Sequence, residues 1–410
     1  MPTTTDAPSQ TPAFGDEIGP VLGNVRNTIG ELLASLPELR RPCDLKRIMG
    51  LDYRLSWRLF QVAQAVDPLA IGPHVPGTAA MQRFLEKAGE CGASAPVIQA
   101  ARQAAQEFDR LVDRYADNRG SFDAMVAAIA GESGAKLDWE HKRALFQAAT
   151  LLYGIQVRTH LTCFILKQGS EPGLLDSVSL RGQYAMRRLR SNAPLFVSRH
   201  RYSSDYDAVG SDFERVPLDP EGMSQHGVSV LNEFCTRPLP ETTTSELSAG
   251  NVQTDLVGGE VGMDSQITCV LGDVGRNLAS PYSDGTLPRI RSNVGTRVPT
   301  EVMVHDVMIP TDLYGPLNPK LFVFTDRSML ELAPGHEQAG LLPIQESVTH
   351  LGRGLGVMHT PDVPRYGEML RFAFDRLGWD PQRFEVYRCR VEYPAMHSIV
   401  SMQFYLPERT

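Results

Sequence analysis

Before Ser170, apolar side chains recur every three or four positions, which is the spacing of amphipathic helices. Outside the segment treated below, the predicted helices run over residues 18–36, 81–89, 95–116, 121–130 and 138–167. The apolar stripe of 95–116 either packs against the same stripe of a second copy of the chain, as in a coiled coil, or forms a seam within one bundle. The segment 138–167 is apolar on most faces, so we expect a central, mostly buried helix that joins the two halves.

Beyond Ser170, short segments rich in Val, Ile, Thr and aromatic residues alternate with Gly, Pro, Asp and Asn. Strands are predicted over residues 253–262, 265–274, 298–310 and 320–325, mainly antiparallel because their connections are too short for crossover helices. A helix at 365–377 and a terminal hairpin of 384–393 and 397–406 around Pro394 follow. The chain is therefore predicted to be α+β, with an all-helical N-terminal half and a mainly antiparallel, β-rich C-terminal half.

These patterns divide the chain into four parts. Residues 1–16 have few hydrophobic side chains to bury and are expected to be a disordered tail. A first domain is expected at 17–66, a helical linker or bundle at 78–168, and an α+β domain at 170–410. The stretch 67–77 is rich in proline and glycine and cannot propagate a helix, so it is predicted to be a loop.

Residues 41–60 carry the most informative local pattern, which predicts two short helices joined by a glycine turn. Pro42 and Asp44 suit the first turn of a helix, and Gly50 suits its end because glycine enters the left-handed conformation without strain. Asp52 can cap the second helix through its side-chain oxygen. The positions expected to face inward are Leu45, Ile48, Met49, Leu51, Ser56 and Leu59.

This stretch resembles the helix-turn-helix of bacterial DNA-binding transcription regulators, and the resemblance covers residues 36–66 only. It implies that the second helix enters the major groove of double-stranded DNA. Lys46 departs from the usual pattern, because such motifs carry a small residue where the two helices cross. A plain helical hairpin within a helical domain, and a helix-turn-helix that serves as a protein contact, remain open as alternatives.

The outward positions of this motif are the candidate DNA-binding residues. The expected phosphate contacts are Arg40, Arg41, Lys46 and Arg47, and the expected base contacts are Tyr53, Arg54, Arg58 and Gln61. A small-molecule effector and a second copy of the chain are further partners that a regulator of this kind would have. The β-rich half would then be an effector or assembly domain, and none of its motifs identifies a family.

The net charge of −8 hides a strong local asymmetry. Residues 36–60 carry six Lys or Arg against three acids, and residues 177–202 carry six Arg and no acid. The second zone supplies a secondary basic patch of Arg181, Arg187, Arg188 and Arg190. These arginines either bind phosphate or pair with the acidic stretch at 203–260, which holds eleven Asp or Glu.

An enzyme is the less favoured hypothesis, because the common catalytic and phosphate-binding motifs are missing and no cofactor is expected. Its strongest form is a metal site of Glu301 and His305 with His350 or His359; otherwise the first two are a solvent-facing pair on an edge strand. A non-catalytic, self-associating assembly protein is a third hypothesis. The six cysteines are scattered and expected to be free thiols, and the chain shows neither a long apolar run nor a secretory signal, so we expect a cytoplasmic protein.

Overall fold

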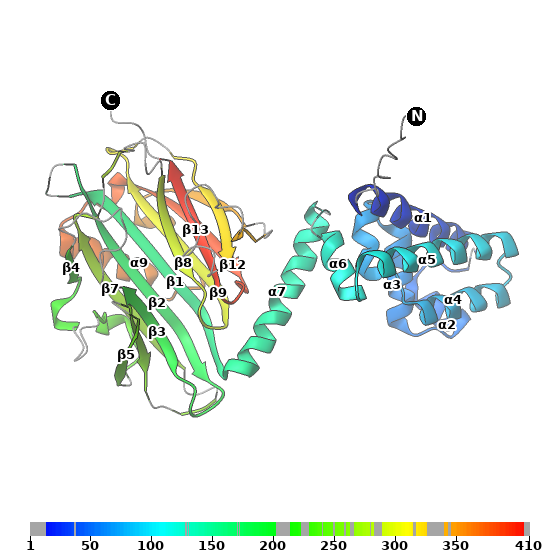
Figure 1. Ribbon diagram of the computed structural model, residues 1–410, viewed down its shortest axis with the longest axis horizontal. Helices are drawn as coiled ribbons and strands as arrows, with labels where there is room; N and C mark the ends of the chain where they lie inside the picture. Colours follow the sequence, from blue (N-terminus) through cyan, green and yellow to red (C-terminus); the bar gives the residue numbers. More distant parts are fainter. Residues whose placement is uncertain are drawn as a thin grey trace, which may run out of the picture. The chain divides into compact units, whose positions relative to one another are not determined.

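The computed structural model describes residues 14–36, 38–127, 129, 131–169, 171, 173–201, 214–222, 229–239, 241–248, 251–257, 260–262, 266–278, 280–282, 289–314, 317–325, 340–342 and 346–405. The chain forms two compact units, residues 1–140 and 141–410 (Figure 1). Helices make up the first unit and strands most of the second, which confirms the α+β prediction. Residues 14–16, assigned by sequence to the tail, begin the first helix, and residues 1–13 lie outside the described part.

The first unit is a bundle of helices. Its elements are α1 (Phe14–Ala34), α2 (Pro42–Met49), α3 (Tyr53–Gln64), the 3₁₀ helix η1 (Pro68–His74), α4 (Thr78–Glu90), α5 (Ala95–Tyr115) and α6 (Arg119–Ala127). The segment 67–77, predicted to be a loop, therefore contains the 3₁₀ helix η1. The Asp67 carboxylate caps the N-terminus of this helix and accepts a hydrogen bond from Leu69 N at 2.9 Å. None of the helices in the described part of the chain is long and apolar enough to cross a membrane.

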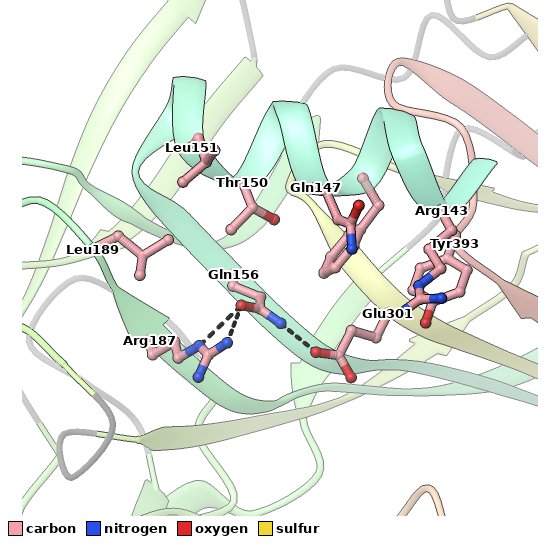
Figure 2. Close-up of a pocket in the computed structure, with 10 residues that line it drawn as sticks. Arg143, Gln147, Thr150, Leu151, Gln156, Arg187, Leu189, Glu301 and Tyr393 are labelled. Atoms are coloured by element: carbon pink, nitrogen blue, oxygen red, sulfur yellow. Dashed lines mark hydrogen bonds between the residues drawn. The ribbon is translucent and has the colours of Figure 1, made fainter. Parts of the chain in front are cut away.

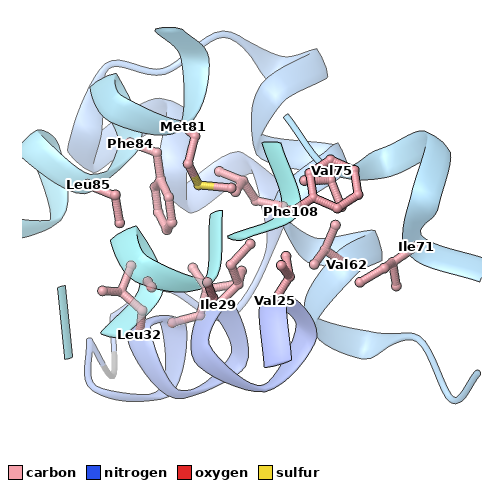
Figure 3. Packing of buried hydrophobic residues seen from close by; sticks show 14 of the residues in the cluster. Val25, Ile29, Leu32, Val62, Ile71, Val75, Met81, Phe84, Leu85 and Phe108 are labelled. Carbon is pink, nitrogen blue, oxygen red and sulfur yellow. The ribbon is translucent and has the colours of Figure 1, made fainter. Parts of the chain in front are cut away.

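One hydrophobic core runs through this bundle (Figure 3). Ile29 and Leu32 of α1 lie among buried side chains of α3, α4 and α5, including Phe84 and Phe108, both at most 1 % exposed. Helix α5 packs on α1 and α4, so its apolar stripe is a seam within one bundle. The predicted boundary between residues 66 and 78 is therefore wrong, because α4, α5 and α6 share the core of the helix-turn-helix segment.

The predicted helix at 138–167 is wrong in its second half. Helix α7 (Gly131–Tyr153) ends before Gly154, whose φ of +70° favours glycine, and strand β1 (Ile155–Gln168) follows. Strand β1 is buried on both faces, and its buried residues include polar ones such as Thr159, His160 and Thr162. Ile155, Val157 and Leu161 follow the odd positions of a strand, whereas the apolar run at 163–166 is equally compatible with a helix. Helix α7 is also less buried than expected, since Leu151 and Leu152 are exposed.

A seven-stranded sheet forms the centre of the second unit, in the order β11-β12-β9-β1-β2-β7-β4. Two three-stranded sheets, β10-β13-β8 and β3-β6-β5, complete it. The remaining elements are β2 (Leu175–Arg188), β3 (Leu195–Arg201), β4 (Glu214–Pro217), β5 (Thr242–Ser248), β6 (Asn251–Leu256), β7 (Ile267–Arg276), β8 (Arg289–Gly295), β9 (Thr300–Pro310), β10 (Lys320–Thr325), β11 (Val348–Arg353), α9 (Tyr366–Leu377), β12 (Phe384–Glu392) and β13 (Ser398–Tyr405). The named strands pair antiparallel except β1 with β9, which agrees with the mainly antiparallel prediction.

The central sheet is the middle layer of this unit (Figure 1). Helix α9 covers one face, where its Leu370 and Phe374 pack with Leu161 of β1. The small sheets cover the other face: β8 and β13 pack on one part of it through Met402, and β3 and β6 on another part through Leu195. Side chains on the two faces of β1 and β9 are therefore buried in different environments.

The terminal strands are present where the sequence predicts them, but they do not form a hairpin. Strand β12 pairs with β9 and β11 in the central sheet, whereas β13 pairs with β10 and β8 in a small sheet. Between them, Tyr393 and His397 both have positive φ, 49° and 57°. The chain thus crosses from one layer to the next at Pro394, and the hydrophobic alternation of the strands does not encode which partner each one takes.

Candidate nucleic-acid interface

Helices α2 and α3 are joined by the short turn Gly50 to Asp52. Gly50 has φ 67° and ψ 20°, and its N–H donates to the carbonyl of Lys46 at 3.2 Å, which ends α2. The carboxylate of Asp52 accepts a hydrogen bond from Leu55 N at 2.9 Å and begins α3. Ser56 is fully buried, and its hydroxyl donates to the carbonyl of Asp52 at 2.9 Å, so the inward polar residue of the motif is satisfied.

The first half of α3 presents its outward side chains to solvent. Tyr53 is 56 % exposed and Trp57 is 39 % exposed, and Arg54 between them is exposed as well. Tyr53 and Trp57 are four residues apart and therefore share one face of the helix. The base contacts predicted from the sequence do not include Trp57. Its spacing of four residues from Tyr53 is the sequence signal that assigns it to the same exposed face.

Four exposed cationic side chains precede this half-helix in the chain, in α2 and just before it: Arg40, Arg41, Lys46 and Arg47. Because Lys46 is exposed, its large side chain does not occupy the crossing of α2 and α3, which resolves its departure from the motif. Two of the three nearby acids are engaged. One Asp44 oxygen accepts from the backbone N–H groups of Arg40 and Arg41, at 3.1 and 2.9 Å, and the other pairs with Arg47 at 3.2 Å, while Asp52 caps α3. The segment therefore carries a surplus of exposed positive charge.

Arg58 is the predicted base contact that the structure contradicts. Its guanidinium donates to three backbone carbonyls at the end of η1, those of Pro73, His74 and Val75, at 2.9–3.2 Å. Partial burial, together with the charge of Arg119, lowers the pKa of Arg58. The side chain points outward from α3, as predicted, but the 67–77 segment folds back over it, and Arg58 serves as the cap of that segment.

Gln61 lies about one turn further along α3 and is half-buried, and η1 packs against this helix. The ring of His74, in η1, makes an edge-on contact with Trp57, with centroids 5.3 Å apart. The surface available to a partner is therefore the first half of α3 and the cations of 40–47, and it excludes the second half of α3.

The secondary basic patch does not form a surface. Arg181 pairs with Asp273, a downstream acid that lies beyond the predicted acidic stretch, and Arg187 donates to the side chain of Gln156. Arg188 is buried and donates to the carbonyls of Ala193 and Leu256, and Arg190 donates to that of Leu151. Phosphate binding by these four arginines together is thus excluded by their separate environments. Much of the acidic stretch at 203–260 lies outside the described residues.

The proposed metal ligands are also kept apart. His305 is fully buried on the interior strand β9, so it is not part of a solvent-facing pair on an edge strand. His350 on β11 pairs with Glu385 at 2.7 Å, and His359 is exposed on the α9 face of the sheet. Within the described part of the chain, no group of three His, Cys, Asp or Glu is placed to hold a metal ion. The described ranges also contain all six cysteines, and each is a free thiol.

Comparison with known proteins adds little to this geometry. No family model and no curated protein matches the chain. Among solved structures, the chain is similar to a putative protease from Parabacteroides distasonis, at 8 % identity and a TM-score of 0.25, over 62 % of this chain and 41 % of that one. This chain thus spans less than half the length of that protein, and a likeness so low carries no argument about fold or function.

Proposed function

We propose that the protein binds double-stranded DNA through α2 and the first half of α3, and that it is a sequence-specific transcription regulator. The single observation that carries the proposal is the exposed N-terminal half of α3, with Tyr53, Arg54 and Trp57, in a segment that also exposes the cations of 40–47. In helix-turn-helix proteins, the N-terminal residues of the second helix are the ones that contact base edges.

The residues divide into two roles by their position. Arg54 is the base-reading candidate, because a guanidinium can donate two hydrogen bonds to the O6 and N7 atoms of guanine. Arg40, Arg41, Lys46 and Arg47 are the phosphate contacts, which supply affinity without sequence preference. Arg58 is removed from the interface because its guanidinium binds the carbonyls of residues 73–75, and Gln61 is removed because it is half-buried.

The test begins with selection of bound duplexes from random DNA by the intact chain, followed by anisotropy titrations of the selected duplex and of an unrelated one. We expect Arg54→Ala to weaken binding of the selected duplex by about 1–3 kcal/mol, roughly 5- to 150-fold, and to change binding of the unrelated duplex little. Arg41→Ala should weaken both duplexes equally and reduce the slope of log K against log salt by about one.

Arg102→Ala is the matched control, since Arg102 is an exposed arginine on α5 of the same unit. It should leave both affinities within about twofold of the unaltered chain, because single exposed charges outside an interface contribute little. Failure of the selection to enrich any sequence, with binding that Arg54→Ala does not alter, would reject the proposal and favour a protein contact for this surface.

A further inference from the structure

A cavity of about 500 Å³ lies in the second unit, between the last turns of α7 and the strands β1, β2 and β9 (Figure 2). Its volume is that of a site for a small organic molecule. The strands contribute polar side chains to its lining, and the helix contributes both polar and apolar ones. The lining residues are far apart in sequence, since Arg143 and Tyr393 are separated by more than two hundred residues.

The floor of the cavity is a chain of three polar side chains. Arg187 donates through Nε to the Gln156 amide oxygen at 2.9 Å and through Nη2 to the same atom, while the Gln156 amide nitrogen donates to Glu301. A guanidinium only donates and a carboxylate only accepts, so this arrangement fixes the orientation of the amide between them. Gln156 is 6 % exposed, and it holds a positive and a negative group at defined places on the floor.

The roof carries a hydroxyl that lacks a partner. Thr150 is 7 % exposed, and its Oγ1 makes no hydrogen bond with any described residue. A threonine inside a helix ordinarily satisfies its hydroxyl on the carbonyl one turn earlier. Figure 2 shows the Thr150 side chain beneath α7, on the side of the helix that faces Gln156. A buried hydroxyl left in this way is unfavourable, and an acceptor or donor on a bound molecule would relieve it.

The remaining walls combine apolar side chains, the Gln147 amide, the Tyr393 ring and one further cation. Phe146 packs against Tyr393, with ring centroids 5.2 Å apart, while Leu151 and Leu189 form an exposed apolar rim. Arg143 is the second guanidinium of the lining, and its charge is opposite to that of the Glu301 carboxylate. The lining therefore holds two formal positive charges, on Arg143 and Arg187, and one formal negative charge, on Glu301, which favours a monoanion over a dianion.

From these observations we infer that this cavity binds a small organic monocarboxylate with an apolar body. The carboxylate lies toward Arg187 and Arg143 and accepts the hydrogen bond of the Thr150 hydroxyl, and the apolar body lies against Phe146, Leu151 and Leu189. Glu301 disfavours a second negative charge on the ligand, which separates this class from phosphate monoesters. The inference is independent of DNA binding, since every residue that it uses belongs to the second unit.

The experiment titrates the intact chain with phenylacetate and hexanoate, and with the uncharged phenylacetamide and hexanamide, and follows the melting temperature and the heat of binding. We expect saturable binding of at least one carboxylate, at least tenfold tighter than its amide. Arg187→Gln should weaken that binding at least tenfold. Arg383→Gln, an exposed arginine paired with Asp312 elsewhere in the unit, is the matched control and should leave it unchanged.

Thr150→Val separates ligand binding from folding, because the two should respond in opposite directions. The substitution keeps the shape and removes an unsatisfied buried hydroxyl, so the melting temperature without ligand should stay constant or rise. The carboxylate should nevertheless bind severalfold more weakly to this variant. Absence of saturable binding by either carboxylate, equal binding of carboxylate and amide, or tighter binding of phenyl phosphate than of phenylacetate would each overturn the inference.

Discussion

The two units differ most in what they bury. In the described part of the first unit, the buried polar side chains are Thr28 and Ser56, and each hydroxyl is satisfied by a carbonyl of its own helix. The second unit buries ionisable groups, including His160, His305 and the pair Asp306 and Arg388. The first unit therefore resembles a conventional hydrophobic bundle with its charges outside, whereas folding of the second depends on satisfying charges inside.

The buried charges of the second unit join α9 to the central sheet. Arg388 on β12 donates to both oxygens of Asp306 on β9, at 2.8 and 2.7 Å, and Tyr366 of α9 donates to Asp306 at 2.7 Å. Burial alone would lower the pKa of Arg388, but the hydrogen bonds and charge of Asp306 outweigh it and raise that pKa. Burial and the same carboxylate raise the pKa of Tyr366 as well. The Arg388 guanidinium and the Tyr366 hydroxyl are therefore held in their protonated forms, which donate hydrogen bonds to Asp306.

The largest expected effect comes from breaking this pair. Arg388→Ala leaves the Asp306 carboxylate buried without its main partner, and we expect it to lower the free energy of unfolding of the second unit by about 3–5 kcal/mol. Urea unfolding, followed by the near-ultraviolet signal and by proteolysis of each unit, would measure this loss. The exposed pair Arg383 and Asp312 supplies the control, because Arg383→Ala should cost at most about 1 kcal/mol. Equal losses in the two variants would contradict a special role for the buried pair.

The second expected effect is a loss of stability in acid that is confined to the second unit. Burial lowers the pKa of His160 to about 4, with a smaller contribution from Arg181, and burial lowers that of His305 to about 4. Hydrogen bonds between the His305 ring and the backbones of Ser292 and Thr162 favour the protonated form and offset part of this lowering, but burial outweighs them. The unfolded chain takes up these protons near pH 6.5, so the stability is fully present above that pH and falls as the pH drops toward 4.

Each histidine should remove about 3 kcal/mol over that interval, although their mutual repulsion makes the two contributions non-additive. Melting curves between pH 7 and pH 4.5 would show it. His305→Met should reduce the acid loss by about half, since it removes one of the two buried rings that titrate over this interval. His359→Gln, at an exposed position, is the control. An acid loss that His305→Met leaves unchanged would place its origin elsewhere.

The same difference explains what the sequence predicts well. Helices of the first unit bury one face only, so the three- and four-residue spacing locates α1, α4 and α5 closely. In the second unit β1 is covered on both sides by its partners β2 and β9 and by the layers on each face, and its apolar run at 163–166 is compatible with a helix as well as with a strand. Strand positions near the C-terminus were predictable, but their assignment to different sheets was not.

The candidate sites show the same limit. The pattern of α3 identifies outward residues but does not distinguish Arg54 from Arg58, because the covering segment is set by the path of 67–77. The cavity residues Thr150, Gln156 and Glu301 come from a helix and two strands, and their meeting depends on the parallel pairing of β1 and β9. No local spacing in the sequence records that pairing, so the site had no signature to detect.

The smallest of the three effects separates the two arginines of α3 and so tests the outer surface of the first unit. Arg58 and Arg119 together occupy four carbonyls at the end of η1, since Arg119 donates to Gly72. Arg58→Ala should therefore lower the free energy of unfolding of the first unit by about 2 kcal/mol, the range for hydrogen bonds to a charged group. Arg54→Ala, on the exposed face, should change it by less than about 0.5 kcal/mol. We expect Arg54→Ala to lower DNA affinity at constant stability, and Arg58→Ala to act first on stability. This result would support the division of α3 into a contacting half and a supporting half. The reverse pattern would place the contact surface on the half that η1 covers.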